Sequence, residues 1–231
     1  MNRKIIITKD GSPSIEAGSG ITYHSTHGAI QESQHIYIRE GFRHLAPGKE
    51  PVHIFEMGMG TGLNVILTLL EAERVSRPVI YETIEAFPLE PDHLAALNYC
   101  TLLNRPDLQN SFEAIHSSPW EEPVRLSHSF TFYKAEKNLL DCTLRQPAGL
   151  VYFDAFAPDV QPELWSRPVF EKLYTQLLPG ALLLTYCSKG EVRRSMLAAG
   201  FQVTKLPGPP GKKEILRATK PQDAPGPYAK E

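Results

Sequence analysis

Residues 55–64 read FEMGMGTGLN and place three glycines, Gly58, Gly60 and Gly62, within five positions. An apolar run, PVHIFEM (51–57), precedes them, and LNVILTLLEAERV (63–75), which has helical length, follows them. Glycine inside a regular element costs about 0.5–1 kcal/mol relative to alanine, so the cluster needs a reason. The stretch predicts a buried strand, a turn that brings backbone close to a ligand, and a helix whose first N–H groups are unpaired.

The rest of the chain continues this alternation. Further strands are expected at 79–85, 129–135, 149–156 and 181–188, and further helices at 89–103, 163–178 and 189–200. The helix over 163–178 contains Pro168 and should begin properly near that residue. Residues 201–206 and 214–220 are expected to form a final hairpin around GPPGKK. Apolar strands that alternate with helices predict an α/β fold, with a mostly parallel sheet covered on both faces and an antiparallel C-terminal edge.

Composition and length fit one globular domain. The chain has 231 residues, of which 42% are hydrophobic and 22% charged. We expect a single domain over 1–220, made of a small β-rich extension (1–50) and a Rossmann-like core (51–220), and a flexible tail over 221–231. No apolar run approaches the roughly 20 residues of a membrane helix. The three cysteines form no CxxC pair, which favours reduced thiols in the cytoplasm, and the histidine spacing predicts no metal site.

The spacing of the glycines indicates which ligand the turn binds. Gly58, Gly60 and Gly62 give GxGxG, whereas dinucleotide-binding turns have GxGxxG. The shorter form with a preceding acid, here Glu56, is typical of S-adenosylmethionine-dependent methyltransferases. A carboxylate would repel a pyrophosphate, but it suits the cationic aminoacyl group of S-adenosylmethionine. A tight turn without a ligand is the alternative.

Two further positions support a nucleoside-containing cofactor. Glu85 ends the second strand of the core, 27 positions after Gly58, where a carboxylate can accept both ribose hydroxyls. Taken alone, a glutamate at a strand end is more often a solvated cap. Ala135 and Glu136 follow the third strand, where such folds recognise the adenine.

Asp154 ends a strand that is otherwise almost wholly apolar, in VYFDAFAPD. A carboxylate at that place is expensive to desolvate without a partner. It either caps the following loop or faces the substrate, with APDVQPELW (157–165) forming a wall of the pocket. Because a carboxylate raises the pKa of a neighbouring amine, an acid here suits electrostatic stabilisation and orientation of an amine better than its deprotonation.

Positive charge is concentrated near the C-terminus. The formal net charge is −2, which argues against general nucleic-acid binding, but residues 186–220 carry a net +6 and the remainder −8. The basic stretch predicts a track for RNA phosphates on one sheet edge. The expected contacts are Lys189, Arg193 and Arg194, which could also form an ordinary solvated helix face, and Lys212 and Lys213 beside the GPPG turn.

Four motifs together resemble one family. They are YHSTHGAIQESQHIYI (23–38), EMGMGTGLN (56–64), YFDAFAPDVQPELWS (152–166) and AGFQVTKLPGPPGKKEILRATK (199–220). The chain resembles the tRNA methyltransferase domain of MnmC, also found alone as MnmD, from about Tyr23 to Lys220. The resemblance implies a class I methyltransferase that methylates the aminomethyl group of a modified wobble uridine in the tRNA anticodon stem-loop, giving 5-methylaminomethyl-(2-thio)uridine. Only eleven residues follow Lys220, so neither the FAD-dependent partner domain nor FAD is expected.

The resemblance also implies roles for individual residues. Asp154 would be the catalytic acid. Asn64 would join the glycine turn in binding the cofactor, and Tyr23, Ser25, Glu32 and Ser33 would line the methionine end. Tyr23, Phe156 and Trp165 could stack on the uracil, with Pro158 shaping the same loop, although core packing is the commoner role for each aromatic.

Two other functions stay open. An aminopropyltransferase also uses an acid after the fourth core strand, but it needs a strongly acidic pocket for polyamines, which the basic C-terminal third disfavours. A non-catalytic RNA-binding module is the second alternative. The intact glycine turn, Glu85 and Asp154 argue against it.

Overall fold

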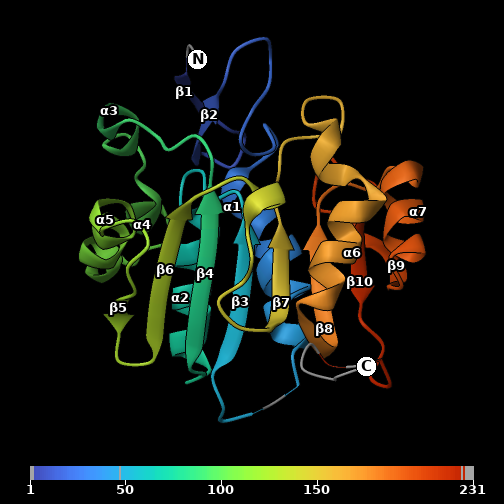
Figure 1. Cartoon of the computed structure of the whole chain (residues 1–231). Helices are drawn as coiled ribbons and strands as arrows, with labels where there is room; N and C mark the ends of the chain where they lie inside the picture. Colours follow the sequence, from blue (N-terminus) through green and yellow to red (C-terminus); the bar gives the residue numbers. More distant parts are fainter. Residues whose placement is uncertain (1–2, 47, 225, 227–231) are drawn as a thin grey trace.

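The computed structural model describes residues 3–46, 48–224 and 226. Its centre is an eight-stranded sheet in the order β5-β6-β4-β3-β7-β8-β10-β9 (Figure 1). The strands are β3 (Val52–Met57), β4 (Val79–Glu85), β5 (Val124–Ser127), β6 (Phe130–Glu136), β7 (Ala148–Phe153), β8 (Leu177–Thr185), β9 (Gln202–Pro207) and β10 (Glu214–Thr219). The five strands from β6 to β8 run parallel, while β5, β10 and β9 pair antiparallel. The predicted parallel core and antiparallel C-terminal edge are confirmed.

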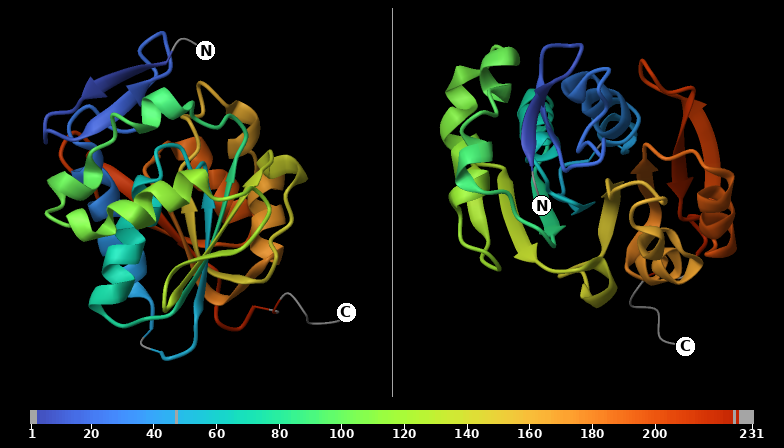
Figure 2. Two further views of the ribbon diagram at one scale, coloured as in Figure 1. Left: turned by 90° about the vertical axis from the view of Figure 1, so that its left-hand side faces the viewer. Right: turned by 90° about the horizontal axis from the view of Figure 1, so that it is seen from above.

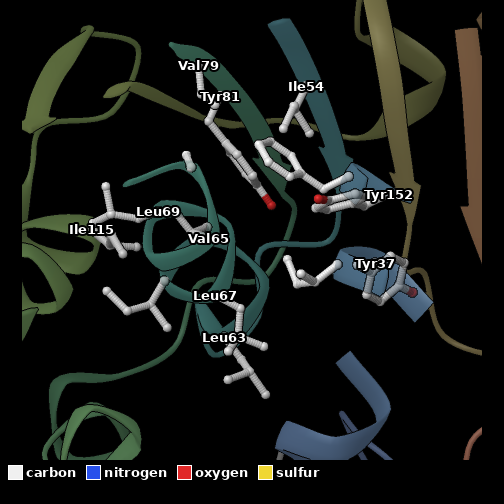
Figure 3. Packing of buried hydrophobic residues seen from close by; sticks show 14 of the residues in the cluster. Tyr37, Ile54, Leu63, Val65, Leu67, Leu69, Val79, Tyr81, Ile115 and Tyr152 are labelled. Atoms are coloured by element: carbon white, nitrogen blue, oxygen red, sulfur yellow. The ribbon is translucent and has the colours of Figure 1, made fainter. Parts of the chain in front are cut away.

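Helices cover both faces of this sheet, as near-continuous apolar strands require. They are α2 (Leu63–Arg74), α3 (Pro91–Leu94), α4 (Tyr99–Leu102), α5 (Gln109–Ser117), α6 (Arg167–Thr175) and α7 (Gly190–Ala198). Core residues of α2, α4 and α5 pack on one face, and those of α6 and α7 on the other. Figure 3 shows the first of these clusters, where Val65 and Leu69 of α2 face Tyr81 and Tyr152 of the sheet. Each fully buried aliphatic side chain contributes roughly 1.5–3 kcal/mol, so this face anchors the turn before α2.

The N-terminal extension is only partly β-structured, so the prediction for residues 1–50 is wrong in its second half. β1 (Lys4–Ile7) and β2 (Pro13–Glu16) form a two-stranded antiparallel sheet. The chain then becomes helical in α1 (Ala29–Ser33), a π-helical segment (Gln34–Arg39) and a 3₁₀ turn (Phe42–His44). The two-stranded sheet of β1 and β2 lies above the carboxyl ends of the parallel strands (Figures 1 and 2).

Several predicted boundaries are corrected by long-range contacts. The helix expected over 89–103 is broken into α3 and α4, because Leu97 is buried and the Tyr99 hydroxyl donates to the Pro13 carbonyl at 2.9 Å. β7 ends at Phe153 rather than 156. β8 spans 177–185 rather than 181–188, since an irregular register with β7 accommodates Pro179 and Gly180 inside the strand. α5 and β5 were not predicted. The tail expected over 221–231 lies largely outside the described residues.

Candidate active site

A cavity of about 360 Å³ opens at the carboxyl ends of the parallel strands. The loops after β3, β4 and β7 form its floor, and residues 20–25 of the N-terminal extension form its roof. Open parallel sheets bind ligands at this edge because the loops after neighbouring strands converge there. Of the residues predicted for the site, the cavity lining includes Tyr23, Ser25, Glu32, Gly58, Gly60, Glu85, Asp154, Phe156 and Lys212.

The glycine turn is shaped by two close approaches. Gly58 and Gly60 both have positive φ, +89° and +50°. A Cβ on Gly58 would lie 3.0 Å from the Asp154 carbonyl oxygen, and one on Gly60 would lie 3.0 Å from the Tyr23 ring. The turn therefore holds the loop after β3 against the loop after β7 and leaves bare backbone on the cavity wall. Gly62 instead faces His116 and does not line the cavity.

Glu85 is held firmly at the end of β4. One carboxylate oxygen accepts a hydrogen bond from the Gly60 amide and the other from the Phe87 amide, both at 2.9 Å. A carboxylate has about four acceptor sites, so Glu85 retains two for ligand hydroxyls. The arrangement fits a ribose.

Glu56 lies beneath the glycine turn rather than on the cavity wall. It is completely buried and accepts hydrogen bonds from Asn64 Nδ2 at 2.9 Å and from Thr83 Oγ1 at 3.0 Å. Burial raises its pKa to about 8, and the charge of Asp154 acts in the same direction. The expectation that Glu56 contacts the aminoacyl group of the cofactor is not supported by this position, because its carboxyl group faces Asn64 and Thr83 instead.

Asp154 follows β7 directly, and its side chain lines the cavity. Its Oδ2 accepts a hydrogen bond from Asn64 Nδ2 at 2.9 Å. Burial raises the pKa of Asp154 to about 7, and the charge of Glu32 adds to this. The hydrogen bond from Asn64, the nearby Tyr37 hydroxyl and the positive charge of Lys212 lower it. The pKa of the Asp154 carboxyl group in the cavity therefore lies near neutral pH.

The N-terminal extension brings some of the predicted residues to the cavity, together with others that sequence reasoning did not single out. Tyr23 meets Phe156 edge to face, with ring centroids 5.1 Å apart. His24 had no signal in the sequence, since the histidine spacing predicts no metal site. Its Nε2 lies 2.8 Å from Thr61 Oγ1 in the glycine turn, and burial lowers its pKa to about 4, so it is a neutral link between extension and turn. Ser33 is buried in α1 and does not line the cavity.

Two tyrosines were also missed. Tyr186 follows β8, lines the cavity and donates to the Ala155 carbonyl at 2.8 Å. Tyr37 lies in the π-helical segment and its ring is 4.9 Å from that of Tyr152, two residues before Asp154 (Figure 3). The signal for Tyr186 was its place after a predicted strand at the ligand-binding edge. Tyr37 had no local signal, because its role depends on packing against a distant strand.

Several predicted contacts lie outside the cavity. Ala135 is buried, Glu136 is exposed, and neither lines it. Trp165 is a core residue. It packs against Phe153 at a centroid distance of 4.9 Å and donates from Nε1 to the Phe156 carbonyl at 2.8 Å. Pro158 is also buried and does not line the cavity. Trp165 thus positions the loop after β7 from behind.

Most of the basic residues near the C-terminus have partners, so the predicted phosphate track is narrower than the charge count indicates. Lys220 is buried and donates to the carbonyls of Tyr174 and Leu177 at 3.0 Å, which closes the C-terminal end of α6. Four more of these basic side chains form ion pairs: Lys189–Asp159 at 2.6 Å, Lys205–Glu214 at 2.7 Å, Lys212–Glu32 at 3.4 Å and Arg217–Glu40 at 3.8 Å. Arg194 and Lys213 are exposed, and Arg193 is half-buried.

Two negative observations concern the described residues alone. Among them, no three His, Cys, Asp or Glu side chains are grouped so that they could hold a metal ion. None of their helices is long and apolar enough to cross a membrane. The expectation that the protein uses neither metal nor FAD stays a prediction.

Comparison with known proteins agrees with this geometry. A family model described as S-adenosyl-L-methionine-dependent methyltransferase matches residues 112–221. The tRNA 5-methylaminomethyl-2-thiouridine biosynthesis bifunctional protein MnmC of Maricaulis maris is 30% identical over 215 residues, which cover 89% of this chain and 36% of that protein. MnmC of Pseudomonas paraeruginosa is 30% identical over 226 residues, covering 87% of this chain and 32% of the relative. The chain spans about a third of the length of these curated relatives.

Solved structures show the same fold. The crystal structure of MnmC2 from Aquifex aeolicus superposes with a TM-score of 0.72, at 23% identity, and covers 99% of this chain and 73% of that one. Spermidine synthase from Thermotoga maritima superposes with a TM-score of 0.53 at 11% identity, over 98% of this chain and 70% of that one. The chain has the class I fold of S-adenosyl-L-methionine-dependent methyltransferases, and residues 112–221 are similar to that family in sequence. The predicted fold class is confirmed.

The cavity of this methyltransferase fold fits S-adenosylmethionine. Glu85 offers a fixed carboxylate for the ribose, and Gly58 and Gly60 leave space that a Cβ would occupy. Ser25 and Glu32 line the cavity from the N-terminal extension, where the aminoacyl end of the cofactor would extend, and the Tyr23 ring lies against Gly60 of the glycine turn. Asp154 lines the same cavity beside the glycine turn, with its carbonyl oxygen 3.0 Å from where a Cβ on Gly58 would lie.

Proposed function

We propose that this protein transfers a methyl group from S-adenosylmethionine to the aminomethyl nitrogen of a modified wobble uridine in tRNA, giving 5-methylaminomethyl-(2-thio)uridine. The observation that carries the proposal is Asp154, a carboxyl group that lines the cavity next to the glycine turn and is held there by Asn64. The names of the MnmC relatives supply the substrate class. The proposal includes the cytoplasm as location, the anticodon stem-loop as partner, and residues 1–220 as one domain.

The residues of the chain would divide the ligand into two ends. Glu85 and the amides of the glycine turn would hold the nucleoside, and Ser25 and Glu32 the aminoacyl group, with Tyr23 over the turn. When bound, the cofactor supplies an electrophilic methyl group on a sulfonium. The protein's contribution is to fix this methyl group against the incoming amine, since orientation supplies a large share of the barrier reduction in a two-substrate transfer.

Asp154 would act on the amine by charge and direction. As the nitrogen forms its bond to the methyl carbon, positive charge appears on nitrogen, and a fixed carboxylate stabilises it there. An alkylamine with a pKa of about 10.4 requires roughly 4–5 kcal/mol to free its lone pair at pH 7. Because burial raises the pKa of Asp154 to about 7, its carboxyl group carries the stabilising charge only as the pH reaches and passes neutrality. The excess proton would leave to water.

Aromatic side chains would hold the base beside Asp154. Tyr23 and Phe156 are half-buried on the cavity wall and lie edge to face, so the exposed face of either ring can stack on a flipped-out pyrimidine. Trp165 would support this arrangement indirectly through its hydrogen bond to the Phe156 carbonyl. Exposed Arg194 and Lys213 would contact RNA phosphates, with Arg193 as a half-buried neighbour.

Mass spectrometry of tRNA nucleosides tests the proposal. The purified protein and S-adenosylmethionine are incubated with tRNA that carries 5-aminomethyl-2-thiouridine, and the digest is analysed for the methylated nucleoside. We expect one added methyl group, and a much slower gain with the Asp154→Asn variant. If the nucleoside stays unmethylated while decarboxylated S-adenosylmethionine and a polyamine are consumed, the protein is an aminopropyltransferase instead.

A further inference from the structure

Two oppositely charged side chains face the cavity from different parts of the sheet. Asp154 follows β7, and Lys212 lies in the loop between β9 and β10. In the strand order, β8 and β10 lie on the opposite side of β7 from β3 and β4, which carry the glycine turn and Glu85. Lys212 therefore approaches Asp154 from the side away from Glu85 and the nucleoside end of the cofactor site.

Contacts from two segments hold Lys212 in place. Its Nζ lies 3.4 Å from Glu32 Oε1 and 4.7 Å from the centroid of the Tyr186 ring. Glu32 is itself held, because its other oxygen accepts a hydrogen bond from the Ser25 amide at 2.7 Å. The hairpin turn is pressed against His27 at Gly211, where there is no room for a Cβ.

The ammonium group of Lys212 still has donors to offer. An ammonium carries three N–H donors and no acceptor. One is directed to Glu32 at a long 3.4 Å, and the Tyr186 ring attracts the charge without using up a hydrogen bond. The Lys212 side chain is 28% exposed, so it lies in the cavity wall rather than in solvent. Neighbouring Lys213 is exposed and suits a phosphate contact instead.

We propose that Lys212 determines the specificity of the site for uridine by donating a hydrogen bond to the 4-oxo group of the pyrimidine while Asp154 takes the adjacent aminomethyl group. The inference rests on the proposed function. In 5-aminomethyluridine the amine and the O4 acceptor are on neighbouring ring atoms, which matches a carboxylate and an ammonium on neighbouring cavity walls. Cytidine has an amino group at C4, so it would direct N–H donors at a cation that cannot accept them.

The experiment compares two stem-loops and four proteins. The RNAs are anticodon stem-loops identical except for 5-aminomethyluridine or 5-aminomethylcytidine at the wobble position, and the proteins are the wild type, Lys212→Met, Lys212→Arg and Lys213→Met. Single-turnover methylation gives kcat/KM for each pair. We expect the wild type to prefer uridine on the order of 10²-fold or more, since a site with a polar partner for one group rejects its analogue strongly.

The variants should respond differently. Lys212→Met should lose most of the preference, chiefly through slower methylation of the uridine RNA, and Lys212→Arg should restore part of it. Lys213→Met should weaken the binding of both RNAs equally, so the ratio of the two kcat/KM values stays unchanged. It should also reduce the slope of log affinity against log salt concentration by nearly one. In calorimetry, Lys212→Met should bind S-adenosylmethionine with the same affinity as the wild type. This result would also show that the variant is folded.

Two results would overturn the inference alone. One is a Lys212→Met protein that keeps the full preference for uridine. The other is a Lys212→Met protein with much weaker cofactor binding, which would assign the ammonium to the carboxylate of the cofactor. A wild-type protein that methylates neither RNA would overturn the proposed function, and this inference with it.

Discussion

Asn64 donates a hydrogen bond from Nδ2 to Asp154 at 2.9 Å, and the same nitrogen donates to Glu56 at 2.9 Å. One amide thus joins the cavity carboxyl group to a completely buried one. Two carboxyl groups that share a donor in a desolvated place resist being charged together. Burial is the main cause of the raised pKa values of Glu56, about 8, and Asp154, about 7, and the charge of Asp154 raises the pKa of Glu56 further.

Removing the shared donor should affect stability and pH dependence together. Asn64→Leu fills a similar volume but leaves both carboxyl groups without that partner, so the free energy of unfolding should fall by roughly 1–3 kcal/mol. Asp154 should also become harder to ionise, and the methylation rate at pH 7 should fall more than the rate at pH 9. Urea unfolding and single-turnover rates measure these effects. The control is Thr83→Val, which removes a donor to Glu56 only; an equal change in the pH dependence of both variants would contradict the account.

The Asp154→Asn variant tests the role of the charge. It keeps the shape of the side chain, so cofactor affinity should change little, while kcat should fall on the order of 10²–10³-fold, as for the loss of one preorganised stabilising group. In the wild type, the logarithm of the rate should rise with a slope of about two below pH 7, because Asp154 and the amine must both lose a proton, and about one above it. The variant should show a slope of about one throughout. A wild-type rate that is flat above pH 7 would mean that Asp154 removes the proton from the amine itself.

Glu56→Gln should make stability less dependent on pH. The pKa of Glu56 is raised from 4.5 to about 8 in the folded protein, so its stabilising contribution is complete below pH 4.5 and is lost as the pH rises towards 8. The variant cannot ionise. Between pH 5 and 9 its stability should fall less than that of the wild type, by on the order of a few kcal/mol, and it should be the more stable protein at pH 9. Chemical unfolding across this range measures the difference, and a Glu56→Gln protein as pH-dependent as the wild type would show that Glu56 is already charged in the folded protein.

Gly60→Val should abolish cofactor binding. Gly60 has φ +50°, and a side chain there would meet the Tyr23 ring at 3.0 Å and project into the cavity wall. Backbone strain alone should lower stability by about 1–3 kcal/mol. Gly11→Val is the matched control, since Gly11 also has a positive φ, +83°, but no atom lies within 4 Å of its added Cβ. Calorimetry should show normal cofactor affinity for the control and none for Gly60→Val; unchanged affinity in both would remove the cofactor from this turn.

Trp165→Phe should behave as a core substitution. Its ring is 4% exposed and packs on Phe153 and Tyr186, and its Nε1 donates to the Phe156 carbonyl. The loss of this hydrogen bond and of ring volume should lower the free energy of unfolding by about 1–3 kcal/mol. The KM for tRNA should change far less than in a Phe156→Ala variant. A large rise in the KM for tRNA with an unchanged free energy of unfolding would instead indicate that Trp165 contacts the substrate.

The sequence alone determined the central sheet, the glycine turn, Glu85 and Asp154. These features depend on local spacing, because apolar runs of strand length set which segments are buried and the residues after each parallel strand must meet at one edge. The prediction of one helix over 89–103 was wrong because its break depends on a long-range contact and not on local spacing. Its break is imposed by Tyr99, whose hydroxyl reaches Pro13 far back in the chain.

Contacts between distant segments determine which of the charged and aromatic residues line the cavity. Glu56 precedes the glycine turn in sequence, yet its carboxyl group faces Asn64 and Thr83 beneath the cavity. Lys212 and Lys213 are adjacent and chemically identical, but only Lys212 meets Glu32, which is 180 positions away. The state of a charge depends on its desolvation and its partners, and both are set by contacts between segments that the sequence pattern does not connect.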